Sequence, residues 1–366
     1  MLKFISNNNR IFEEKNIFND DGLIEDKMKI LSSNAFQRLT SKSQVLPAFH
    51  GNHYKNRLTH TLEVAEVAKN IAKYLDLNED LAEIISLVHD IGHPPFGHVG
   101  ENIINDILKP YNKNFNHNDH VLKVFTKIER WSNKFSGVNL NIDVLDGMLK
   151  HNGPVINPSV YVLEYAKQYN LNLNSRASLE SQIAAVSDDI AYLSHDLEDA
   201  IRSSIVCINE LKKLKILSKF ENFDENQIRQ IRIKITKEAI DDVFRNTADR
   251  LNKFKISAPD QVVNFSENIV DFSDEFRIPL NELRKFLLDK YYHSQLVLDY
   301  NVETCNIINN IFRKLIKNPN FMTNQIWIDE YNFCQNESDK IDVIIDYIAC
   351  MTDTFAATFN DYLNNN

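Results

Sequence analysis

Glycine and proline are scarce in this chain. Its 366 residues include 8 Gly and 9 Pro, whereas average usage of about 7% and about 5% would give roughly 26 and roughly 18. A β-sandwich or β-barrel needs residues of this kind at every hairpin, so the scarcity excludes a many-stranded β-fold. We therefore predict an all-α fold built mostly of long helices.

Cysteines and long apolar runs are also few. The four cysteines lie far apart and form no Cys-x-x-Cys pair, so we expect neither a disulfide framework nor a zinc knuckle. No apolar run reaches the roughly 18 residues of a membrane helix, and the first ten residues lack the pattern of a signal peptide. These features predict a cytoplasmic protein with no membrane partner.

Positive charge is in deficit, with 41 Lys and Arg against 51 Asp and Glu and a net charge of −10. This charge repels a phosphate backbone at long range, so general binding to duplex nucleic acid is not expected. A site for an anionic substrate would have to carry its own cations.

Apolar residues spaced i, i+3, i+4, i+7 predict the main helices. These cover residues 60–75, 79–88 behind an Asn78 cap, a segment from about 99, 178–201, 279–316 and 340–363. We expect an irregular N-terminal segment at 1–27, a core at 28–205, and a helical C-terminal region at 206–366 that packs on the core.

The few turn-forming residues are concentrated directly after the predicted helix 79–88. Gly92, Pro94, Pro95, Gly97 and Gly100 fall within nine residues of one another. The same stretch reads His89-Asp-Ile-Gly-His-Pro-Pro-Phe-Gly-His98, which places three histidines around one turn. We expect the chemistry of the protein to lie here.

A metal site is one interpretation of this stretch. His89 and Asp90 are adjacent at a helix end, His60 lies on the preceding predicted helix, and Asp188 lies on the helix 178–201. Two imidazoles and two carboxylates leave a divalent cation open positions for water and a phosphate oxygen, and Mn²⁺, Mg²⁺, Co²⁺, Fe²⁺ or Ni²⁺ would suit them. By itself, a His-Asp pair is more often a hydrogen-bonded pair at a helix end.

His98 and Glu101 suggest proton transfer beside this site. They are three residues apart at the start of the next predicted helix, so the carboxylate can orient the imidazole. A histidine paired in this way can transfer a proton near neutral pH.

With these residues in place, the chain resembles the HD-domain phosphohydrolases, and specifically the deoxyguanosinetriphosphate triphosphohydrolase family of dNTP triphosphohydrolases. Six segments resemble family motifs in the same order. They are residues 35–45, 56–64, 89–98, 115–118, 187–200 and 346–353. The resemblance implies an HD-domain helical fold with a helical C-terminal extension.

The resemblance also implies a reaction and the groups that perform it. A dNTP, with dGTP as the first expectation, would be hydrolysed at the α-phosphate to a deoxynucleoside and triphosphate. The metal ligands would be His60, His89, Asp90 and Asp188, with Asp188 preferred over Asp189. Proton transfer would fall to His98, supported by Glu101, and to His117, while His93 would line the phosphate site.

Substrate contacts are implied in the same way. Gln44 would lie near the sugar 3′-hydroxyl, Arg57 near a phosphate, Tyr192 and Asp196 at the deoxyribose, and Tyr291 would stack on the substrate. A homo-oligomer, either tetramer or hexamer, is implied as well, with single-stranded nucleic acid or a dNTP as a further partner.

Plainer interpretations stay open for many of these residues. Arg57 could form an ion pair, Tyr192 and Tyr291 could be core aromatics, Asp196 could be an exposed carboxylate, and Gln44 and His117 could be loop residues. The other histidines are expected to be structural; these are His120, His151, His195 and His293.

Two other functions compete with dNTP hydrolysis. Another HD phosphohydrolase, such as a nucleotidase or cyclic-nucleotide phosphodiesterase, needs the metal site but not Gln44, Tyr192 or Asp196. A nucleotide-sensing or single-strand-binding protein would use the pocket without turnover, although binding alone needs no general acid.

Overall fold

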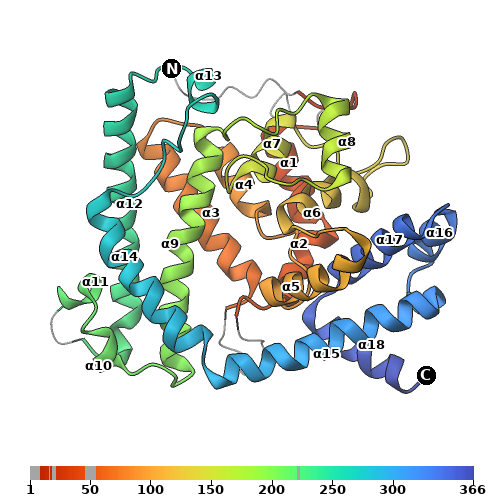
Figure 1. Ribbon diagram of the computed structural model, residues 1–366. Helices are drawn as coiled ribbons and strands as arrows, with labels where there is room; N and C mark the ends of the chain where they lie inside the picture. Colours follow the sequence, from red (N-terminus) through yellow and green to blue (C-terminus); the bar gives the residue numbers. More distant parts are fainter. Residues whose placement is uncertain (1–8, 16, 19–21, 46–54, 221–222) are drawn as a thin grey trace.

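The computed structural model describes residues 9–15, 17–18, 22–45, 55–220 and 223–366. Within these ranges the chain forms helices and no β-strand, with only three isolated β-bridges. The all-α prediction is therefore confirmed (Figure 1). None of the described helices is both long and apolar enough to cross a membrane.

The α-helices follow one another along the whole described chain. The first nine are α1 Gly22–Ser32, α2 Asn34–Arg38, α3 Arg57–Tyr74, α4 Glu79–Val88, α5 Gly97–Leu108, α6 His117–Lys123, α7 Ile142–Lys150, α8 Val160–Tyr169 and α9 Leu179–Arg202. The later ones are α10 Ile208–Leu211, α11 Lys215–Ser218, α12 Ile228–Phe254, α13 Pro259–Val263, α14 Asp274–Leu287, α15 Gln295–Lys317, α16 Gln325–Phe333, α17 Glu337–Ala349 and α18 Asp353–Asn364.

Helix α4 has the predicted bounds, and its start has a clear physical cause. The Asn78 side chain accepts a hydrogen bond from the Leu81 backbone N–H at 3.1 Å, as an N-cap does. Its apolar residues Leu81, Ile84, Ile85 and Val88 are all buried. The helix thus ends in the core, where His89 begins the turn to α5.

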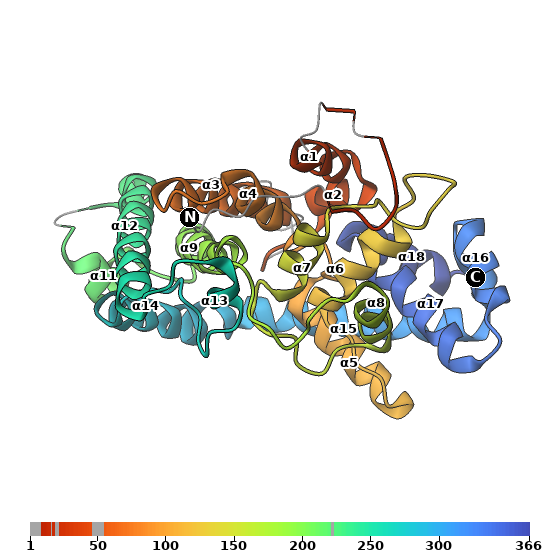
Figure 2. The same cartoon turned by 90° about the horizontal axis from the view of Figure 1, so that it is seen from above.

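Three hydrophobic cores hold the helices together. The first joins α3, α9, α12 and α14, the second joins α1, α4, α6 and α7, and the third joins α5, α15, α17 and α18. Helix α15 belongs to two of them, because Val297 packs in the first core and Ile308 in the third. Figures 1 and 2 show α15 running along one side of the molecule between these two groups of helices.

Three predicted segments differ from the structure. Residues 279–316 form α14 and α15, separated by the π-helical turn η6 (Leu288–Tyr292), and Ser294 has extended backbone before α15 begins. Residues 340–363 form α17 and α18, because the Thr352 side chain caps a new helix. The segment 1–27 is not irregular throughout, since α1 already begins at Gly22. A π-helical turn interrupts the first of the two long segments and the Thr352 cap interrupts the second, and apolar spacing detects neither feature.

Candidate active site

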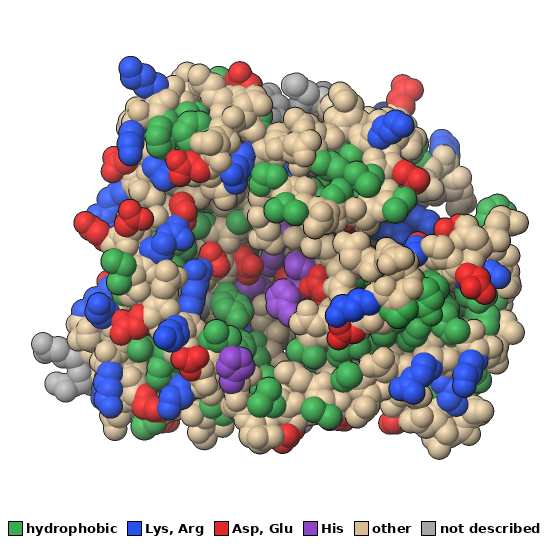
Figure 3. All heavy atoms as spheres, in the orientation of Figure 1, with side chains coloured by type: hydrophobic (Ala, Val, Ile, Leu, Met, Phe, Trp, Pro, Cys, Tyr) green, Lys and Arg blue, Asp and Glu red, His purple; other side chains and the backbone are tan. Residues whose placement is uncertain are grey.

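A cavity of about 890 Å³ opens between the helical groups. Figure 3 shows it as a hollow near the centre of one face, with histidine and acidic side chains inside. Its walls come from α3, the α4–α5 turn, α6, α9, η6 and α15. Many of the predicted site residues line it: Gln44, Arg57, His89, Asp90, His93, His98, His117, Asp188 and Tyr192.

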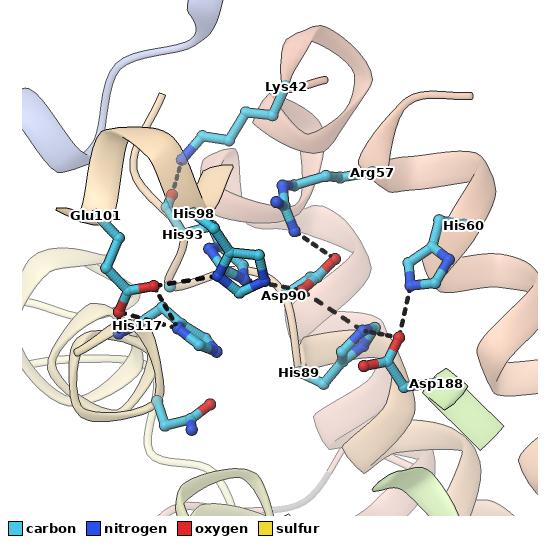
Figure 4. Close-up of polar contacts among 12 residues, drawn as sticks. Lys42, Arg57, His60, His89, Asp90, His93, His98, Glu101, His117 and Asp188 are labelled. Carbon is cyan, nitrogen blue, oxygen red and sulfur yellow. Dashed lines mark hydrogen bonds and ion pairs between the residues drawn. The ribbon is translucent and has the colours of Figure 1, made fainter. Parts of the chain in front are cut away.

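The four predicted metal ligands meet on one side of this cavity (Figure 4). His60 Nε2 lies 2.8 Å from Asp188 Oδ1, and His89 Nε2 lies 3.6 Å from both Asp188 Oδ1 and Asp90 Oδ1. The ligand atoms of His60, His89 and Asp90 all fall within 4.8 Å of one another. Residues from three helices that are separate in sequence can therefore surround one small ion.

The His89 ring is oriented for ligation. Its Nδ1 hydrogen-bonds the Ser86 carbonyl oxygen at 2.7 Å, so Nδ1 carries a hydrogen and Nε2 is the nitrogen available to bind an ion. This Nε2 is buried and has no hydrogen-bond partner among the described residues. A buried imidazole nitrogen directed at two carboxylates fits a divalent cation, which also suits the mixed nitrogen and oxygen donors.

The carboxylates of the cluster are ionised. Burial raises the pKa of Asp188, but the nearby His89 and His60 outweigh it and hold that pKa well below its usual value. The neighbouring Asp189 instead forms an ion pair with Arg284 at 2.7 Å. It is therefore Asp188, and not Asp189, that faces the imidazoles.

Arg57 forms a buried ion pair with one of these carboxylates. Its Nη1 lies 2.7 Å from Asp90 Oδ2, and its side chain is only 1% exposed. Burial raises the pKa of Asp90, but Arg57, His89 and His93 together outweigh burial, so the net shift of this pKa is strongly downward. Gly97, at φ +58°, leaves room for the guanidinium, because a Cβ there would lie 2.4 Å from Arg57 Nη2.

A second cluster of titratable side chains lies on the other side of the cavity. His117 Nδ1 lies 3.0 Å from Glu101 Oε2, and the His117 backbone N–H donates to Glu101 Oε1 at 2.9 Å. His98 is 3.4 Å from the same carboxylate and its side chain is 73% exposed. Glu101 therefore holds His117 more closely than it holds His98, the histidine three residues before it.

His93 connects the two clusters. Its Nε2 lies 3.2 Å from Asp90 Oδ1, and its ring stacks on His117 with centroids 3.9 Å apart. Burial, Arg57 and His117 lower the pKa of His93 well below its usual value, so the ring is neutral. The backbone carbonyl of His93 accepts a hydrogen bond from the buried Lys42 ammonium.

Comparison with known proteins places this chain in a family. The HD domain family matches residues 57–193, and a phosphohydrolase-associated domain matches residues 270–361. The chain is 41% identical over 361 residues to a deoxyguanosinetriphosphate triphosphohydrolase-like protein of Rickettsia typhi (strain ATCC VR-144 / Wilmington), covering 95% of this chain and 92% of that protein. The chain belongs to this HD-domain family.

Other proteins are similar to different degrees. A deoxyguanosinetriphosphate triphosphohydrolase-like protein of Rickettsia prowazekii (strain Madrid E) is 39% identical over 359 residues, covering 95% of this chain and 92% of that protein. Among solved structures, a hypothetical protein from Aquifex aeolicus has a TM-score of 0.30 and 19% identity, covering 74% of this chain and 69% of that one.

The substrate side of this HD-domain protein departs from the prediction at two residues. Tyr291 is fully buried in the first core, and of these two adjacent tyrosines it is Tyr292 that lines the cavity. Asp196 is only 1% exposed, and it accepts a hydrogen bond from the Tyr292 hydroxyl behind the cavity wall. Because η6 is π-helical, α-helical spacing does not tell which of two adjacent tyrosines faces the cavity.

The remaining substrate predictions fall at the cavity. Tyr192 lines it and stacks on Tyr292, with ring centroids 6.0 Å apart and planes 7° apart. Gln44 lines it near the end of a described range, and its Oε1 is buried without a hydrogen-bond partner among described residues. Their roles stay predictions, but both side chains are in place to meet a ligand.

Sequence reasoning missed several residues that line the cavity. Arg284 of α14 contributes a guanidinium beside Asp189, and His151 and Asn152 follow the end of α7. The sequence predicts a structural role for His151, whereas the structure places it in the cavity wall. No motif marks any of the three, since each reaches the cavity through packing between helices that are distant in sequence.

Proposed function

We propose that this protein is a metal-dependent dNTP triphosphohydrolase that cleaves a dNTP, with dGTP as the first substrate to test, into a deoxynucleoside and triphosphate. The proposal rests on one observation: the cluster of candidate metal ligands and the cluster of candidate proton-transfer residues lie at the same cavity. The names of the similar Rickettsia proteins point to the same substrate class.

His60, His89, Asp90 and Asp188 would hold the divalent cation, and their nitrogen and oxygen donors suit Mn²⁺, Mg²⁺, Co²⁺, Fe²⁺ or Ni²⁺. When bound, the ion supplies Lewis-acid polarisation of the α-phosphate and of the attacking water. Arg57 neutralises Asp90 on the side away from the imidazoles, which keeps that carboxylate ionised and in position.

His117 is the proposed general acid. Glu101 binds its Nδ1, so Nε2 is left to face the leaving group. As water adds to the α-phosphorus and the bond to the sugar O5′ breaks, His117 would give its proton to that oxygen. The more exposed His98 is the second candidate for this transfer, and the neutral His93 would hold the phosphate side.

The sugar and base would occupy the wall formed by Gln44, Tyr192 and Tyr292, with Arg284 as an additional cation near the phosphates. We assign the predicted stacking role to Tyr292 in place of Tyr291. Asp196 would act through the Tyr292 hydroxyl that it binds. We infer from the sequence that the enzyme is cytoplasmic. We also infer that it works as a homo-oligomer, and light scattering can test that oligomeric state.

A product-resolved assay tests this function. The four dNTPs and their ribonucleotide counterparts would each be incubated with Mn²⁺, Co²⁺ or Mg²⁺. The expected products are deoxynucleoside and intact triphosphate, with dNTPs favoured over ribonucleotides. Release of diphosphate, monophosphate or orthophosphate alone would contradict the proposal and favour another HD phosphohydrolase. Binding of dNTPs without turnover under every metal would favour a nucleotide sensor.

A further inference from the structure

The two ring nitrogens of His60 face two different partners. Its Nε2 lies 2.8 Å from Asp188 Oδ1, and its Nδ1 lies 3.3 Å from His195 Nδ1. The His60 and His195 rings meet nearly at right angles, with centroids 5.4 Å apart. Both side chains are fully buried. His195 therefore contacts the candidate ligand His60 on the side away from the candidate ion position.

Glu63 lies directly behind His195. One of its carboxylate oxygens hydrogen-bonds His195 Nε2 and also lies 3.2 Å from Arg232 Nη2, while the other lies 2.5 Å from Lys55 Nζ. A carboxylate between two cations is ionised, and an ionised carboxylate can only accept hydrogen bonds. The hydrogen in the pair with Glu63 must therefore be on His195 Nε2.

This assignment determines the tautomer of His60. A neutral imidazole carries one hydrogen, so with that hydrogen on Nε2 the Nδ1 of His195 is an acceptor. The contact between the two Nδ1 atoms is then a hydrogen bond only if His60 Nδ1 donates. With Nδ1 donating to His195, Nε2 is the His60 nitrogen directed at Asp188, and it would give its lone pair to an ion that displaces the hydrogen it shares with Asp188 Oδ1 at 2.8 Å.

We propose that His195 and Glu63 are positioning residues for metal binding, which hold His60 in the tautomer and orientation that ligation by Nε2 requires. His89 reaches the same state by a different route, through the backbone carbonyl of Ser86. The His60 route consists of side chains, so substitution can interrupt it. This inference rests on the proposed function, because it assumes that the cluster binds a divalent ion.

The test measures metal affinity directly on the full-length protein. Partners of this kind typically change metal affinity by about 10- to 100-fold, and we expect His195→Leu to weaken Mn²⁺ binding by about that much in competition with a chelator. His195→Asn returns an acceptor oxygen near His60 Nδ1, so its affinity should lie within about threefold of the wild type. Glu63→Gln should fall between the two variants.

A matched control separates positioning from damage to α9. Leu197 is buried two residues from His195 and packs in the first core. Leu197→Ala should lower the melting temperature and leave the Mn²⁺ affinity unchanged. The visible spectrum of bound Co²⁺ gives a second readout, which should change in His195→Leu and keep its wild-type shape in Leu197→Ala.

The outcomes distinguish this inference from the proposed function. If the wild-type protein binds no divalent ion, the proposed function fails. If the wild type binds Mn²⁺ and His195→Leu binds it equally well, the inference alone is overturned. Equal weakening by Leu197→Ala would also overturn it. Should His195→Leu not fold, Glu63→Gln decides, and an unchanged affinity in that variant contradicts the inference.

Discussion

One carboxylate, that of Glu101, organises the side of the cavity where we propose proton transfer. This carboxylate contacts the His117 imidazole and accepts a hydrogen bond from the His117 backbone N–H. The imidazole of His98 lies farther from it. Burial raises the pKa of Glu101, but the hydrogen bonds from His117 and His98 outweigh it, and the net shift is well below the usual value. Glu101 is therefore ionised at neutral pH and able to orient a protonated histidine.

We expect Glu101→Gln to lower kcat on the best dNTP by roughly a hundredfold, the lower end of the usual contribution of a positioned general acid. The amide has the same size but no charge to stabilise protonated His117. Chelator competition should show unchanged Mn²⁺ affinity, and a kcat within threefold of the wild type would contradict the assignment.

Buried His120 makes stability depend on pH. Its Nδ1 lies 3.0 Å from the Gly92 carbonyl oxygen, and burial, partly offset by that hydrogen bond, lowers its pKa from 6.5 to about 3. Between these two values the unfolded chain binds the proton and the folded chain does not. Its contribution to stability is therefore present above about pH 6.5 and decreases as the pH falls toward about 3.

The variant His120→Asn keeps a donor for the Gly92 carbonyl and does not titrate. Urea unfolding at pH 7 and pH 5 should show that the wild type loses about 2 kcal/mol more stability over this interval than the variant does. Equal losses in the two proteins would show that His120 is not the group responsible.

At the scale of elements, the turn between α4 and α5 depends on glycine for close packing. A Cβ at Gly92 would lie 1.9 Å from the His117 carbonyl oxygen and 2.7 Å from the Val121 backbone nitrogen, both in α6. The absence of this carbon lets α6 approach the turn that carries His89 and Asp90. The glycines concentrated here thus bring the two clusters together.

We expect Gly92→Ala to push α6 away, lowering both the melting temperature and kcat, with a cost of several kcal/mol because the clash is with backbone. Gly153→Ala is the control. Gly153 has φ +111°, but a Cβ there meets no atom within 4 Å, so only backbone strain of about 1 kcal/mol is expected. If Gly92→Ala costs no more than the control, close packing of α6 is not what requires the glycine.

Helix prediction succeeded where a cap and an apolar face coincide, as in α4. It failed where the chain breaks its period. The π-helical turn η6 and the Thr352 cap divide two segments that apolar spacing predicts as single helices. The period of 3.6 residues holds only within one regular α-helix. It therefore cannot predict which side chains face the cavity beyond such a break.

At the scale of the whole molecule, Asp353 ties three distant parts of the chain together. From the start of α18 its carboxylate accepts hydrogen bonds from the Ser43 backbone N–H at 2.8 Å, from the Ser43 hydroxyl, and from the Phe96 backbone N–H at 2.8 Å. Phe96 is the N-cap residue before α5, and its backbone is in the left-handed region, with φ 65°. The C-terminal helices thereby support the turn that carries His93 and His98.

We expect Asp353→Ala to destabilise the protein by about 3 kcal/mol, because it leaves buried donors without an acceptor, and to lower kcat by loosening the turn. Asp353→Asn keeps one acceptor and should lose less. Asp361→Ala, at an exposed position of the same helix, should change the unfolding free energy by no more than about 0.5 kcal/mol. Urea unfolding and dNTP turnover measure both effects, and equal behaviour of Asp353→Ala and Asp361→Ala would exclude this support.

The sequence by itself determined the all-α class, the bounds of α4 and the residue types of the candidate metal cluster, because these depend on composition, on helical period and on the adjacency of His89 and Asp90. Tertiary structure alone decided that Arg57 pairs with Asp90, that Glu101 holds His117 more closely than His98, and that Tyr292 replaces Tyr291 at the cavity. The physical reason is the range of the interactions. Period and caps act over a few residues, whereas these contacts form only when helices distant in sequence pack against one another.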